Sequence, residues 1–205
     1  MRPTTRTLHR ESGQGILEGL TVIALVGTMT AVTLPAVQTL RKEAALQRAA
    51  RLVCGLIVRG RALSVARGRA VALVFERDGD RWRCFLAEDG DGDGVNRADL
   101  RSGRDAITGE VHRLASGGAG PGILPGEPVP DPSGRGILRG DPGDPIRAGR
   151  GDIITLKGGG TATPGSIYLS DGVSRMRVIR IYGATARVRQ MVWRRGWPRW
   201  KKAGW

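Results

Sequence analysis

Aromatic residues, histidine and cysteine are all scarce in this chain of 205 residues. Phe, Tyr and Trp make up 4% of it, and there are two His and two Cys. A structural zinc site takes about four Cys or His ligands, so zinc fingers and multi-ligand zinc enzymes are poorly supplied. His112 lies in a Gly-rich region with no evident Ser or Cys nucleophile beside it, so we expect no enzyme.

Acidic residues are missing from one end of the chain. Lys and Arg total 33 against 19 Asp and Glu, giving a formal net charge of +14. Ten of the basic residues and none of the acids lie between Val173 and Trp205. The basic character therefore belongs to the C-terminus, where it favours contact with DNA or with anionic lipid headgroups.

Ionisable side chains are also absent near the N-terminus. The 22 residues from Gly19 to Leu40 carry no charge, and as a helix they would cross a hydrocarbon core of about 30 Å. This run is too long for the apolar core of a secretory signal peptide, which has roughly 7–15 residues. We therefore predict a transmembrane and assembly helix at 14–40, preceded by a short basic segment at 1–13.

Apolar periodicity predicts that this helix continues to residue 68. Apolar residues recur at steps of three and four, and Gly68 is a suitable C-terminal cap. The periodic positions are Ala45, Ala49, Leu52, Val53, Leu56, Leu63 and Ala66. We expect an amphipathic helix at 41–68.

Strand signals dominate the remainder, 69–193. Runs at 70–76 and 81–87 flank Asp78-Gly79, a dipeptide typical of hairpin turns, and four further runs resemble strands. Between Glu88 and Asp152, 16 Gly and 7 Pro predict a loop-rich insertion. The fold class is therefore α+β: a long N-terminal helix, transmembrane then amphipathic, and a small antiparallel β-sheet domain with a Gly/Pro-rich insertion at 88–152. Residues 194–205 form a basic Trp/Arg tail.

A lone carboxylate stands at the start of the charge-free run. Glu18 follows Gly13-Gln14-Gly15-Ile16-Leu17, and Pro35 lies further along. This arrangement resembles the N-terminus of type IV pilins and type II secretion pseudopilins, in which prepilin peptidase cuts after the Gly. Counted from Gln14, Glu18 is the fifth residue and Pro35 the twenty-second, as in the family.

The resemblance implies how such a chain would be used. Residues 1–13 would be a prepilin leader, and Gln14 would be the first residue of the mature chain, the position that is subject to N-methylation in the family. Glu18 would neutralise the new α-amino group of a neighbouring subunit during assembly, with Pro35 in the same assembly helix. The implied location is the inner membrane, single-pass, with the soluble domain in the periplasm or outside the cell.

A narrower resemblance covers the C-terminal half. The segment 160–172, followed by Tyr182-Gly183-Ala184-Thr185-Ala186-Arg187-Val188-Arg189, is similar to GspH/FimT-type minor pseudopilins and minor pilins. That family has a long N-terminal helix and two antiparallel sheets. Its FimT-like members are associated with DNA uptake through a basic Arg-x-Arg region, here Arg187 and Arg189.

An acidic run opens the insertion. Asp89, Asp91 and Asp93 alternate with Gly, which is the spacing of the first half of an EF-hand calcium loop. Position twelve is Leu100, although Asp99 comes one residue earlier. Two interpretations stay open: a solvated acidic turn, which Asp/Gly runs often form, and a calcium site that uses all four aspartates.

Cys54 and Cys84 fall on the predicted helix and on a following strand. An exported domain permits a disulfide between them, but their separation does not follow from the sequence. A bridge and two buried thiols are equal alternatives.

The C-terminal tail alternates tryptophan with basic residues, a composition that can stack on bases and neutralise phosphates. The candidate nucleic-acid residues are Arg187, Arg189, Trp193, Arg194 and Arg195. Contact with lipid headgroups and a plain basic strand end are the alternatives.

Together these features predict a structural minor pseudopilin or minor pilin of a type II secretion or type IV pilus-like fibre. Its partners would be other pilins or pseudopilins, prepilin peptidase and membrane lipid. The alternative is a DNA-binding minor pilin of a transformation pilus. No cofactor is expected apart from the calcium option.

Overall fold

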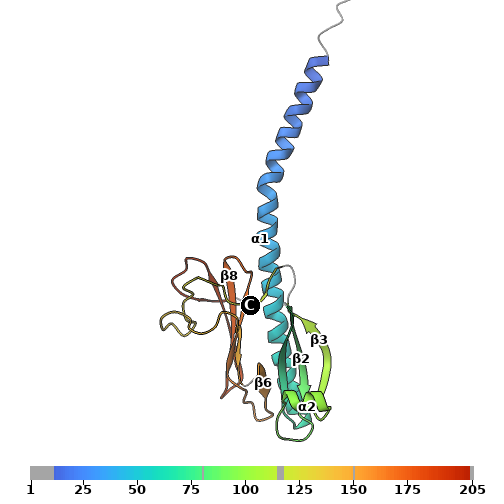
Figure 1. The fold of residues 1–205 in the computed structure, drawn as a ribbon, viewed down its shortest axis with the longest axis vertical. Helices are drawn as coiled ribbons and strands as arrows, with labels where there is room; N and C mark the ends of the chain where they lie inside the picture. The colour runs from blue at the N-terminus through green and yellow to red at the C-terminus, as the bar shows by residue number, and fades with distance from the viewer. Residues whose placement is uncertain (1–11, 80, 115–117, 150, 204–205) are drawn as a thin grey trace, which may run out of the picture. The chain divides into compact units, whose positions relative to one another are not determined.

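The computed structural model describes residues 12–79, 81–114, 118–149 and 151–203 (Figure 1). The chain divides into two compact units after Arg41. Helix α1 (Ser12–Arg67) contributes residues to both units. The proposed leader, 1–13, lies outside the described residues except for its last two positions.

The expected transmembrane helix is wrong. Within the described residues, no helix combines the length and the hydropathy needed to cross a membrane. The expectation rested on a lack of charge, and a charge-free run that contains Gly and Thr is not thereby a strongly apolar one. The expected single-pass location in the inner membrane, with the soluble domain in the periplasm or outside the cell, is wrong for the same reason.

Sheet 1 has four antiparallel strands in the order β3-β2-β1-β6. Strand β1 (Val71–Asp78) and strand β2 (Arg81–Glu88) pair along their full length, which confirms the hairpin predicted around Asp78-Gly79. Gly79 has a φ of 59°, as a tight turn of this kind requires. Strands β3 (Ala106–Arg113) and β6 (Ile153–Leu156) complete the sheet.

Sheet 2 is larger and also antiparallel. Its main path runs β10-β9-β8-β7-β4, and a sixth strand, β5, pairs with β7. The strand bounds are β4 (Gly120–Pro121), β5 (Ile146–Ala148), β7 (Gly165–Ser170), β8 (Arg175–Tyr182), β9 (Arg187–Arg194) and β10 (Lys201–Lys202).

The part of α1 after Lys42 lies between the two sheets (Figure 1). Its buried face packs in one cluster with residues of both sheets, and this cluster is the inner core. Strand β8 alternates between two cores: Ile179 and Ile181 join the inner core, whereas Met176 and Val178 face the other way. This alternation is the period of two expected of a strand covered on both faces.

The insertion at 88–152 contains more regular structure than its Gly and Pro content indicated. It contains helix α2 (Arg97–Ser102), capped by Asn96, and it contributes strands to both sheets. Its segment around Leu124 and Val129 covers the outer face of sheet 2, where Trp193 and Trp200 are also buried, and we call this cluster the outer core. The second unit therefore contains two antiparallel sheets and three buried clusters, and the expected single small sheet is wrong.

Candidate functional site

The residues of the proposed cleavage motif lie at the start of α1. Gly13 and Gln14 are in its first turn, Glu18 is exposed, and Pro35 lies within the helix. Threonine hydroxyls nearby donate to carbonyl oxygens of the preceding turn, as from Thr28 to Leu25 at 2.9 Å. The first unit therefore presents its motif residues along one continuous helix.

Large apolar side chains on this part of α1 are exposed. Ile23 is 70% exposed and Leu25 61%. Leu20, Val22 and Val26 are exposed to a similar degree. Single exposed apolar residues are ordinary, but a cluster of them within two helical turns is typical of an interaction surface.

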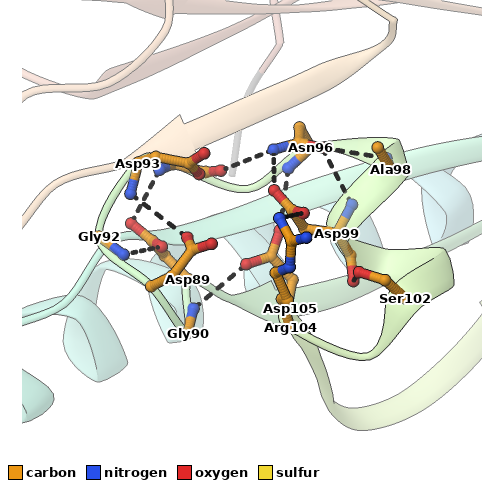
Figure 2. Close-up of polar contacts among 12 residues, drawn as sticks. Asp89, Gly90, Gly92, Asp93, Asn96, Ala98, Asp99, Ser102, Arg104 and Asp105 are labelled. Atoms are coloured by element: carbon orange, nitrogen blue, oxygen red, sulfur yellow. Dashed lines mark hydrogen bonds and ion pairs between the residues drawn. The ribbon is translucent and has the colours of Figure 1, made fainter.

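The acidic loop gathers three of its four candidate ligands (Figure 2). Carboxylate oxygens of Asp89, Asp91 and Asp93 all lie within 4.8 Å of one another. Asp89 accepts backbone hydrogen bonds from Gly92 at 2.7 Å and from Gly94 at 3.0 Å, which shapes the loop. Local desolvation and the negative charges of Asp91, Asp99 and Asp89 raise the pKa of Asp93. Three clustered carboxylates could hold a hard cation such as calcium.

Asp99 has other partners. Arg104 donates to it at 3.1 Å, and the side-chain amide of Asn96 donates to its second oxygen. Figure 2 shows Asp99 and Arg104 beside Asp105, apart from the Asp89 carboxylate. The four-aspartate calcium set is therefore reduced to three, because Asp99 stabilises the start of α2 instead.

The two cysteines are buried free thiols. Burial raises the pKa of Cys84 to about 12. Burial also raises the pKa of Cys54, although Gln190 donates a hydrogen bond to its sulfur at 2.9 Å. Of the two alternatives, the structure has the thiols and not the bridge.

Three of the five candidate nucleic-acid residues have structural contacts. Trp193 is 2% exposed and donates from Nε1 to the carbonyl oxygen of Trp197. Arg195 forms an ion pair with Glu127 at 2.8 Å, and Arg194 lies over the Trp197 ring at 5.6 Å. The tail is therefore part of the outer core and is not a free stacking platform.

Arg187 and Arg189 stay exposed, and the register adds a residue that the sequence reasoning missed. Arg189 lies directly opposite Arg180, Arg180 opposite Ser166, and Ser166 opposite Arg147. Directly opposed residues share a face, so these four side chains form one row across β9, β8, β7 and β5. We call this set the basic row.

The basic row adjoins a surface hollow of about 680 Å³ lined by Arg187, Arg189 and Lys202. None of the described residues that line this hollow is acidic. The row could have been found by reading the alternation of β8 and β9 together, but only with their register known. Electrostatically, the open half of sheet 2 is a cationic surface.

Glu43 is a second residue that sequence reasoning missed. It is the only acid between Glu18 and Glu76, which is the signal that singles it out. Arg175 donates to one carboxylate oxygen at 2.5 Å and Arg177 to the other at 3.0 Å. Burial opposes ionisation of Glu43, but the two guanidinium groups outweigh it and lower the pKa of this carboxyl. Glu43 thus joins α1 to strand β8.

We predict that Glu43→Gln lowers the free energy of unfolding by about 2 kcal/mol at pH 7, because charged hydrogen bonds to two arginines are lost. Because the pKa of Glu43 is lower in the folded chain, the ionised carboxyl stabilises the fold fully at pH values above its pKa in the unfolded chain, 4.5. That stabilisation disappears as the pH falls through the folded pKa. Urea unfolding followed by circular dichroism from pH 7 to pH 3 measures both effects.

Glu110→Gln is the matched control, since Glu110 is exposed on β3. It should change the stability by less than about 0.5 kcal/mol at any pH. Equal stability of the Glu43→Gln variant and the unmodified chain at pH 7 would contradict the assigned role of the ion pair.

Comparison with known proteins identifies no relative. No family model, no curated protein and no solved structure matches the chain. The similarity to pilins and pseudopilins therefore rests on the residues described above.

Proposed function

We propose that this chain is a structural subunit of a pilus-like fibre, of the minor pilin or pseudopilin kind, that assembles through the N-terminal part of α1. The observation that carries the proposal is the cluster of exposed apolar side chains between Leu20 and Val26. Water contact with this much apolar surface is unfavourable at about 25 cal/mol per Å². Packing against the equivalent helix of neighbouring subunits would remove it.

Glu18 supports the same proposal. It is the only acid in the first unit after the cleavage motif, and it is exposed at the start of the helix. Burial of a carboxylate between packed helices is costly unless a positive charge compensates it. The α-amino group released by cleavage before Gln14 in a neighbouring subunit would supply that charge and would fix the register of assembly.

The second unit supplies a folded head with its own core. The inner core contains residues from α1 after Lys42 and from both sheets. Changes to the assembly surface should therefore leave this core intact, which allows assembly and folding to be tested separately.

We predict that Ile23→Glu abolishes incorporation into fibres, because a charge replaces a 70% exposed apolar side chain on the assembly surface. The measurement is the amount of this chain in sheared, sedimented fibres, by immunoblotting. Gln38→Glu is the control, since Gln38 is already polar and exposed. Both variants should retain the melting temperature of the head. Normal incorporation of Ile23→Glu would refute the assembly surface.

A separate prediction concerns processing. Co-expression with prepilin peptidase should give a chain whose intact mass corresponds to a first residue at Gln14, and Gly13→Ala should leave the precursor uncut. Gly15→Ala is the matched control, because a Cβ there meets nothing within 4 Å. A chain purified from its own cells that still starts at Met1 would contradict the proposed processing.

The basic row favours DNA binding as a second candidate function. Arg180 and Arg189 are directly opposed like charges, an arrangement that is unfavourable without a counter-ion. The phosphates of DNA would supply one, and binding of this kind releases counterions and weakens as salt is raised.

Under this second function, Arg187→Ala with Arg189→Ala should weaken DNA binding and reduce the slope of log affinity against log salt by about 2. Electrophoretic mobility shift or fluorescence anisotropy over 50–200 mM salt, roughly the range in which such contacts are resolved, measures it. Arg101→Ala with Arg135→Ala removes the same charge from exposed positions in the insertion. Equal loss in both double variants would mean that only net charge matters.

A further inference from the structure

A small cavity lies beside the Glu43 ion pair. It measures about 180 Å³ and lies where the start of β8 meets the end of β9. Its wall includes Glu43, Arg175, Arg177, Arg194, Lys202 and Trp197. A water molecule occupies about 30 Å³ of liquid, so the cavity has room for an ion with several oxygen atoms.

Positive charge in the cavity wall exceeds negative charge. Four of the described lining residues are cationic, and Glu43 is the only acid among them. Arg175 and Arg194 are also directly opposed across β8 and β9, where like charges repel. Glu43 contacts Arg175 and Arg177, so its single charge leaves Arg194 and Lys202 uncompensated.

Arg177 adds an unused donor. Its side chain is 12% exposed, and its Nη2 is the atom that donates to Glu43. Its Nε is buried and has no hydrogen-bond partner in the described part of the chain. Buried donors are nearly always satisfied, so an unpaired guanidinium nitrogen beside a cationic cavity indicates a missing acceptor.

The cavity wall also has a flat aromatic side. The Trp197 ring lies under the Arg194 guanidinium at 5.6 Å and 4.2 Å from the Lys201 ammonium group. Arg194 is exposed beside this ring, whereas the side chain of Arg177 is largely buried. Guanidinium groups arranged in this way bind planar or tetrahedral oxyanions through paired N–H groups.

We propose that this cavity is an oxyanion-binding site, which takes a carboxylate or a phosphate as the counter-ion of Arg177, Arg194 and Lys202. The two ligands share this chemistry: at least two oxygen acceptors that carry a negative charge. A carboxylate would come from an acidic side chain of a bound partner, and a phosphate would be free in solution. The site does not depend on fibre assembly, because every residue in it belongs to the second unit.

The test is thermal unfolding of the full chain at pH 7 in sodium phosphate and in sodium acetate, against sodium chloride at equal ionic strength. We expect a saturable rise in melting temperature with at least one of the two oxyanions, since a ligand that binds only the folded state stabilises it. Saturation by phosphate identifies the free ion as a ligand, and saturation by acetate identifies a carboxylate.

Arg194→Ala with Lys202→Ala should weaken the apparent affinity at least tenfold. Arg194→Ala also removes the contact with the Trp197 ring, so the shift of each variant is measured from its own melting temperature in chloride. Arg101→Ala with Arg199→Ala is the control with equal charge, and it should keep the affinity of the unmodified chain. The proposal is overturned if neither oxyanion gives a saturable shift, or if both double variants respond like the unmodified chain.

Discussion

One helix serves as the common core element of two sheets, and the rest of the second unit depends on this. Close approach from both sides requires small residues, and α1 provides Ala45, Ala49 and Ala50 within the inner core. Gly60 is the extreme case, because a Cβ there would lie 2.6 Å from a methyl carbon of Leu156 and 3.1 Å from one of Leu86. A larger side chain there would require the Leu156 and Leu86 side chains to move.

The outer face of sheet 2 has a covered half and an open half. Residues of the insertion and two tryptophans of the tail cover the half that contains Met176 and Val178. Trp200 donates from Nε1 to the carbonyl oxygen of Pro130, which joins the tail to the insertion. The other half, around Arg180 and Arg189, is left open. The cover therefore decides which arginines of the sheet can meet a ligand.

Local signals in the sequence were sufficient for some elements. The hairpin of β1 and β2 follows from two β-rich runs and an Asp-Gly turn, all within 18 residues from Val71 to Glu88. The insertion could not be predicted in this way, because isolated apolar residues such as Leu124 and Val129 become a core only against sheet 2. The high Gly and Pro content indicated irregular backbone, but it carried no information about which residues of the insertion pack against the sheet.

The candidate sites were also predicted only where the signal is local in the sequence. Sequence spacing placed three aspartates together, since residues two apart in a turn stay close. It also assigned Asp99 to this cluster, whereas Asp99 accepts hydrogen bonds from Arg104 and Asn96. Tryptophan and arginine in the tail indicated a ligand surface, whereas Trp193 and Trp200 are buried. Glu43 could be recognised as an isolated acid, but its partners lie more than 130 residues away.

Charge compensation separates structural arginines from those available to a ligand. Arg97 donates to the carbonyl oxygens of Phe75 and Gly151, and Arg195 forms an ion pair with Glu127, so both stabilise loops. Arg180 and Arg189 instead face each other across adjacent strands, which lie about 4.8 Å apart. Like charges on directly opposed residues are unfavourable unless an anion is near, and the contact that the described structure gives Arg180 is with the Tyr182 ring. A chain that keeps such a pair on an open face has a position where binding a polyanion would also stabilise its own fold.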